Sequence, residues 1–78
     1  MACFKVTLRS KLDRMLEAAL DELRQSGKVT VVGEGLAASK AVSLAEVVKS
    51  KWPGLSQTNK TYLQSQSSVL EIDLELVT

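Results

Sequence analysis

The sequence predicts an α+β fold of two layers, in which one four-stranded mixed sheet carries two helices on one face. Two observations predict it. Four segments have the alternation or composition of strands, and two segments repeat apolar residues at spacings of three and four, as helices do, in the order βαβαββ. The chain shows no internal repeat and no low-complexity linker, so we expect a single domain over residues 1–78.

The first strand and helix are expected within the first 27 residues. FKVTLR, residues 4–9, alternates apolar with polar side chains, which is typical of a half-buried strand. An apolar stripe in LDRMLEAALDEL then indicates a helix from about Lys11 to Gln25. Ser10 and Asp13 form a variant of the capping box at its start, and Gly27 stands where a helix stop is expected.

The second strand, KVTVV, ends at a Gly-x-Gly turn, and a second helix is expected from about Ala37 to Trp52, where Pro53 ends it. This helix is apolar on two sides. We therefore expect its own sheet to cover one side and a second subunit to cover the other. The predicted dimer-interface residues are Leu44, Val47 and Val48.

The C-terminal third predicts a hairpin. QTNKTYLQSQ and SVLEIDLELV are its two strands, joined by the polar turn QSQSS at residues 64–68. The last strand carries an acidic stripe that would repel nucleic acid, so we expect it to face solvent or a basic partner. The stripe consists of Glu71, Asp73 and Glu75.

Composition limits the function classes. The net charge is +1 and 24% of the residues are charged, so the chain is no polycation, and any binding of nucleic acid must depend on charge asymmetry between faces. A domain of 78 residues has a small core and gains from a partner subunit. No apolar run reaches the ~20 residues that cross a bilayer, and the N-terminal segment is too short and polar for a signal peptide.

Reactive groups are scarce. The chain has one cysteine, Cys3, and no histidine, so an internal disulfide and a structural zinc site are excluded and a reducing intracellular compartment is expected. The serines near Lys40 lack a base with an orienting partner. We therefore expect no cofactor, no metal, no catalytic residues and no enzyme activity.

The best candidate site is the stretch GEGLAASK. Its glycines allow positive φ values and close approach of another molecule to the backbone. The helix that follows offers free N–H groups and a partial positive charge to a phosphate, and Lys40 has small neighbours that leave it room to reach outward. The predicted nucleic-acid contacts are Lys40, Gly33, Gly35, Arg9, Lys11, Arg14 and Lys60.

Each set of candidate binding residues also has a purely structural interpretation. The glycines alone are also compatible with a plain turn, and the basic cluster with a solvated helix start. Lys49 and Lys51 lie at a helix end where cations favour the helix dipole. Trp52 could stack on a base, but a tryptophan at such a place is more often part of a core or an interface.

The spacing G-x-G-x-A-x-x-K-A-V-x-x-A-E-x-x-K, from Gly33 to Lys49, resembles the Alba family of nucleic-acid-binding proteins. The segments RSKLDRMLEAAL and PGLSQT are similar to eukaryotic members, which include the larger of the two Alba-type subunits of ribonuclease P and ribonuclease MRP. The resemblance covers nearly the whole chain and implies the same βαβαββ fold, with the first loop beside the Gly-x-Gly turn. Two features differ: Val32 and Glu34 stand where many members carry arginine, and the hairpin arm is short.

The resemblance implies an RNA-binding protein, a non-catalytic accessory subunit of a ribonuclease P/MRP-like particle that acts in tRNA and rRNA processing. It implies RNA, and also DNA, as ligands and a second Alba-type subunit in a homodimer or heterodimer. The expected location is the nucleus in a eukaryote and otherwise the cytoplasm or nucleoid. Two alternatives remain: a homodimeric chromatin-type DNA- and RNA-binding protein, and a structural assembly module without nucleic-acid contact.

Overall fold

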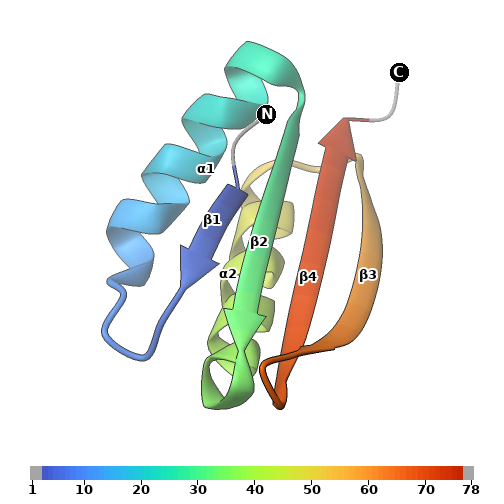
Figure 1. The fold of residues 1–78 in the computed structure, drawn as a ribbon. Helices are drawn as coiled ribbons and strands as arrows, with labels where there is room; N and C mark the ends of the chain where they lie inside the picture. The colour runs from blue at the N-terminus through green and yellow to red at the C-terminus, as the bar shows by residue number, and fades with distance from the viewer. Residues whose placement is uncertain (1–2, 77–78) are drawn as a thin grey trace.

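The computed structural model describes residues 3–76, which form one sheet and two α-helices (Figure 1). Their order confirms the predicted βαβαββ arrangement and the α+β class. The elements are β1 Cys3–Val6, α1 Leu12–Ser26, β2 Lys28–Glu34, a 3-10 turn η1 Gly35–Ala37, α2 Ala38–Lys51, β3 Leu55–Gln64 and β4 Ser67–Leu76.

The strands lie in the order β1-β2-β4-β3, so the last strand of the chain takes an interior position. β1 is parallel to β2, whereas β4 is antiparallel to both β2 and β3, and the sheet is mixed as predicted. Because β4 is paired on both sides, its apolar residues Ile72 and Leu74 are fully buried. The acidic residues that alternate with them, Glu71, Asp73 and Glu75, therefore lie on the opposite face of the sheet.

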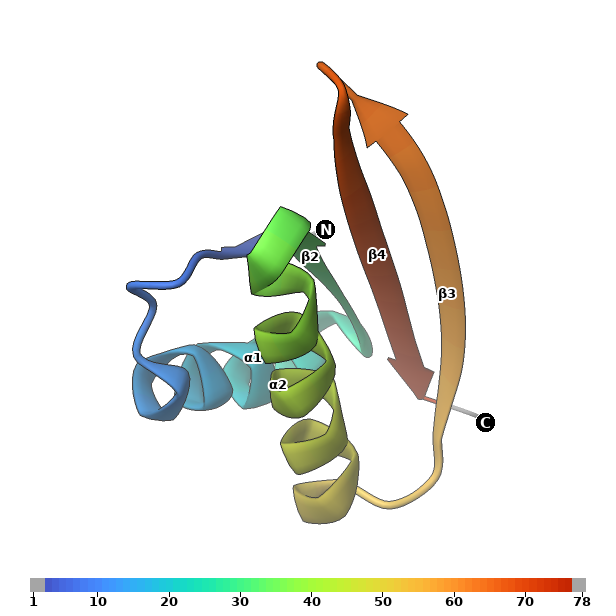
Figure 2. The same ribbon diagram turned by 90° about the horizontal axis from the view of Figure 1, so that it is seen from below.

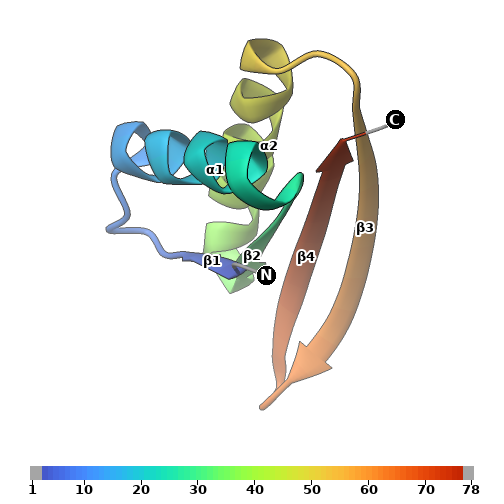
Figure 3. The same ribbon diagram turned by 90° about the horizontal axis from the view of Figure 1, so that it is seen from above.

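Both helices cover one face of the sheet and leave the other face open (Figures 2 and 3). α1 and α2 cross one another on this face, and α2 packs mainly on β2 and β4. β3 forms the edge farthest from the helices, and the tip of the β3–β4 hairpin projects beyond them. The buried core between the layers consists of Val6, Ala19, Leu23, Val29, Val31, Ala41, Leu44, Ala45, Val48, Ile72 and Leu74.

The loop after β1 begins earlier than predicted, because β1 ends at Val6 and not at Arg9. Thr7 and Ser10 close this loop: the Ser10 N–H donates to the Thr7 carbonyl (3.1 Å), and the Thr7 N–H donates to Ser10 Oγ (2.9 Å). The Ser10 hydroxyl is thus used within the loop, and α1 follows Lys11 without a side-chain cap. The predicted capping box is therefore wrong.

Most of the apolar surface of α2 is covered within the chain, by the sheet and by α1. Leu44 and Val48 are 1% and 0% exposed, so they belong to the chain's own core. The prediction that they form a dimer interface is wrong, because buried side chains present no surface to a partner. The wide apolar surface of α2 is needed because this helix packs against both the sheet and a second helix. Val47, at 39% exposed, is still available to a partner.

The hairpin turn is tighter than the predicted polar segment. Ser65 and Gln66 alone connect β3 to β4, with φ values of 50° and 67°. Positive φ at both central residues is the requirement of a type I′ turn, which matches the twist of the flanking strands. The hairpin is confirmed, and it carries no long arm.

Gly33 fixes how closely α2 approaches β2. A Cβ atom at this position would lie 2.7 Å from the Ala37 carbonyl oxygen, 2.8 Å from the Ala41 Cβ and 2.9 Å from the Ala38 Cα. Two of these neighbours are backbone atoms that cannot rotate away. Any side chain at residue 33 would therefore push the helix off the strand.

We expect Gly33→Ala to lower the free energy of unfolding by about 3 kcal/mol, the upper part of the range for overpacking. Gly35→Ala is the matched control, since its Cβ would meet nothing within 4 Å and only its φ of 58° is unfavourable for alanine. Gly35→Ala should lower the free energy of unfolding by about 1 kcal/mol. Urea denaturation measures both, and equal costs would show that the helix approach is not the constraint.

Candidate nucleic-acid interface

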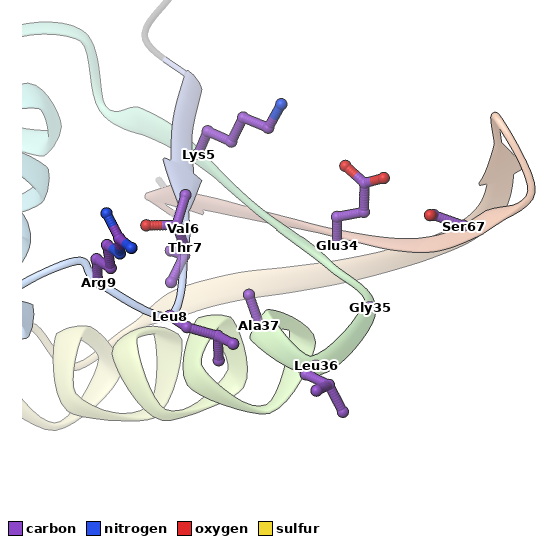
Figure 4. Close-up of a pocket in the computed structure, with 10 residues that line it drawn as sticks. All are labelled: Lys5, Val6, Thr7, Leu8, Arg9, Glu34, Gly35, Leu36, Ala37 and Ser67. Carbon is purple, nitrogen blue, oxygen red and sulfur yellow. The ribbon is translucent and has the colours of Figure 1, made fainter.

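A groove of about 710 Å³ separates the loop after β1 from the turn between β2 and α2 (Figure 4). One wall comes from β1 and the loop, the other from the Gly-x-Gly turn and η1, and the start of β4 closes one end. The two segments that the sequence singled out are therefore neighbours in space. The lining residues are Lys5, Val6, Thr7, Leu8, Arg9, Glu34, Gly35, Leu36, Ala37 and Ser67.

The turn wall depends on two glycines with different roles. Gly33 is buried against α2, where its role is to let the helix approach the strand, and its predicted contact with nucleic acid stays a prediction. Gly35 is exposed, has a φ of 58° and has no atom near the place of a side chain. η1 and α2 then begin without a side-chain cap. The backbone at Gly35 is thus open to a ligand, and its role as a contact stays a prediction.

The basic residues that follow β1 have no carboxylate partner among residues 3–76, and Arg9 is the one of the three that lines the groove. Arg9, Lys11 and Arg14 are exposed, and none of them forms an ion pair within 4.0 Å among residues 3–76. Lys11 and Arg14 also stand at the N-terminal end of α1, where the helix dipole disfavours cations. Their charge is therefore available to an anion.

Lys5 is a groove residue that the sequence reasoning missed. It lies on the outward side of β1, opposite Val32 of β2, and its side chain projects to the same side of the groove as Glu34 (Figure 4). The alternation of β1 gave the signal, since it places Lys5 on the open face of the sheet. Glu34 is the only carboxylate among the groove residues, and it opposes an anion there.

Lys60 lies away from the groove. It pairs with Glu71 across β3 and β4, and Glu71 in turn pairs with Val32, so three strand spacings separate Lys60 from Lys5. At about 4.8 Å per spacing this is about 14 Å. Lys60 lines a separate hollow on the open face, beside Glu71 and Asp73. The structure does not bring it together with the loop cations.

Lys40 does not reach outward. Its side chain is half-buried, and its Nζ donates hydrogen bonds to the Leu8 carbonyl (3.0 Å) and to the Ser10 carbonyl. The first turn of α2 is thereby bound to the loop after β1. The prediction that Lys40 contacts nucleic acid is not tested by this geometry, but its ammonium already has two partners within the chain.

The acidic stripe lies on the open face of the sheet, opposite the helices. The Thr30 hydroxyl donates to Asp73 Oδ1 (2.7 Å), and Lys28 Nζ lies 3.9 Å from Glu75 Oε2. Glu71 pairs with Lys60 across the strands. Each acid therefore has a polar or cationic neighbour within the chain.

The other candidates have structural roles. Trp52 is half-buried and packs against the core. Lys49 Nζ donates to Gln57 Oε1 (2.7 Å) and lies 3.6 Å from Glu46 Oε1, so it connects α2 to β3.

Within residues 3–76, no three or more His, Cys, Asp or Glu side chains gather as they would around a metal ion. The helices described are all too short or too polar to span a membrane.

Comparison with known proteins identifies the family. The Alba family model matches residues 4–65. The ribonuclease P protein subunit p25-like protein of Bos taurus is 43% identical over 67 residues, which cover 82% of this chain and 41% of the relative. The Homo sapiens protein of the same name is 45% identical over 62 residues, or 76% of this chain and 38% of the relative. The chain thus spans about two fifths of the length of these relatives.

Solved structures agree on the fold. ALBA1 from Trypanosoma brucei superimposes with a TM-score of 0.85 at 21% identity, over 96% of this chain and 69% of the other. Alba from Thermoplasma volcanium gives a TM-score of 0.68 at 19% identity, over 94% and 98%. The predicted resemblance to eukaryotic members is confirmed by the p25-like relatives. The chain belongs to the Alba family.

Proposed function

We propose that this Alba-type nucleic-acid-binding protein holds structured RNA at the groove between its basic loop and its Gly-x-Gly turn. The single observation that carries the proposal is the position of Arg9, a cation without a carboxylate partner among the described residues, in the same groove as the exposed backbone of Gly35. Phosphate groups fit both walls, because one offers positive charge and the other offers backbone N–H groups at a helix start. Binding by phosphate contacts and shape is the usual mode for double-stranded RNA.

The distribution of charge supports a local site on a near-neutral molecule. The net charge is +1, but the acids of β4 lie on the open face with partners of their own. The loop cations lack such partners among the described residues. A ligand rich in phosphate is therefore attracted to one edge of the domain.

We further propose a non-catalytic accessory role in a ribonuclease P/MRP-like particle. The support is the similarity to proteins named ribonuclease P protein subunit p25-like, over two fifths of their length. The groove residues include no nucleophile held by a base, so positioning of RNA is the chemistry that they can perform. The predicted nuclear location and the role in tRNA and rRNA processing belong to this proposal.

A second Alba-type subunit is the proposed protein partner. The helix-facing side of β3 extends past the helices, and large apolar side chains remain exposed on η1, α2 and β3. A partner that covers them would enlarge the small core of this domain. The side chains are Leu36, Val42, Val47 and Leu63.

The first prediction concerns the loop cations. Arg9→Gln with Lys11→Gln should weaken RNA binding and reduce the salt slope by about 0.7 to 0.9 for each phosphate that is no longer neutralised. The matched control is Arg24→Gln with Lys51→Gln, which removes two exposed charges from other parts of the surface. Fluorescence anisotropy with a structured RNA at several salt concentrations measures both. Equal slopes for the two variants would contradict a site at the groove.

The second prediction concerns Glu34. Glu34→Gln should strengthen RNA binding by about fivefold at low salt, because it removes a negative charge from the groove, and the gain should fade at high salt. Glu17→Gln on the exposed side of α1 is the control with the same change of charge. A gain of the same size in both variants would point to net charge instead of the groove.

The third prediction concerns the partner surface. Leu63 is 77% exposed on the helix-facing side of β3, so Leu63→Asp should lower the mass in light scattering while the melting curve of the domain stays close to wild type. Tyr62→Asp changes the neighbouring residue, whose side chain lies on the other face of the strand, and should keep the assembled mass. Loss of mass in the control alone would place the partner on the open face.

A further inference from the structure

We propose that Lys40 is a positioning residue, whose ammonium fixes the loop of residues 7–11 so that Arg9 lines the groove. The inference deepens the proposed function and rests on it. It differs from a direct contact, because here the lysine acts on RNA only through the loop.

The hydrogen bonds of Lys40 carry the inference. Its Nζ donates to the carbonyls of Leu8 and Ser10, which are 32 and 30 residues away in the sequence. These two carbonyls stand on either side of Arg9. An ammonium group has three donors and no acceptor, so a pair of carbonyl oxygens suits it, and at most one donor is left for a phosphate.

The loop is closed on its inner side by its own hydrogen bonds. The Ser10 N–H donates to the Thr7 carbonyl, and the Thr7 N–H donates to Ser10 Oγ. These bonds define the turn but do not attach it to the rest of the domain. The described hydrogen bonds that link residues 7–10 to a distant element are those of Lys40.

The same hydrogen bonds couple the two walls of the groove. Lys40 belongs to the first turn of α2, directly after η1, which forms the turn wall. Leu8 and Arg9 belong to the loop wall. These hydrogen bonds therefore set the separation of Arg9 from the open backbone at Gly35. A shift of about one ångström at such a site alters how a phosphate is held.

A first experiment tests, in the absence of RNA, whether the Lys40 hydrogen bonds hold the loop. Lys40→Met keeps most of the side-chain stem and removes the donors, so amide hydrogen exchange should accelerate at residues 8–11 while the amides in the middle of α2 stay protected. Lys40→Arg, which keeps charge and donors, should restore part of the protection. Lys51→Met on the same helix is the control and should leave the loop unchanged. Unchanged exchange in Lys40→Met overturns the proposal.

A second experiment separates positioning from direct phosphate binding by a double-mutant cycle with RNA. Lys40→Met should weaken binding by about tenfold in the wild-type background and by less than about twofold when Arg9→Gln and Lys11→Gln are already present. A direct phosphate contact would instead give the same factor in both backgrounds and lower the salt slope by about 0.7 to 0.9. That result overturns the positioning role.

The results distinguish a failure of the proposed function from a failure of the positioning role. If the variant with Arg9→Gln and Lys11→Gln binds RNA as wild type does, the proposed function at the groove is wrong, and the exchange data still decide whether Lys40 holds the loop. If that variant binds RNA more weakly but Lys40→Met leaves loop exchange unchanged, the proposed function stands and the positioning role of Lys40 is wrong.

Discussion

The close approach of α2 to β2 at Gly33 is the constraint on which the rest of the structure depends. A hydrogen atom in place of a side chain lets the helix backbone at Ala37 and Ala38 reach the strand. The small residue Ala41 continues this packing one turn later. With the helix held there, its first turn stands at the end of the sheet, and Lys40 comes within hydrogen-bond distance of the loop after β1.

The fold could be predicted from the sequence because each element carries a local signal, a periodic pattern in most of them and a strand-like composition in β3. The alternation in β4 and the helix stop at Gly27, with a φ of 76°, depend on neighbouring residues alone. Which element packs against the second apolar side of α2 could not be predicted in this way. A wide apolar surface shows that a helix is covered twice, but whether α1 or a second subunit does so depends on residues far apart in the sequence, and Leu44 and Val48 face the chain's own core.

Some features of the candidate site could likewise be predicted from the sequence, and others could not. The nearness of the basic loop to the Gly-x-Gly turn was predictable from the resemblance, since it follows from the order of the strands. The direction of the Lys40 side chain and the use of the Ser10 hydroxyl depend on the path of a short loop, which no periodicity records. The separation of Lys60 from the groove required the register of three strand pairs.

The nearly neutral charge of the chain is compatible with binding to a polyanion because the charges are segregated. Acids on the open face are matched by a hydroxyl at Thr30 and an ammonium at Lys28, whereas the loop cations have no such match among residues 3–76. Long-range attraction is then weak, and the geometry of the groove must contribute more to affinity than total charge does. Under the proposed function, the residue that fixes the loop matters as much as the residues that carry its charge, and a second subunit that adds another groove would raise affinity without adding cations to this one.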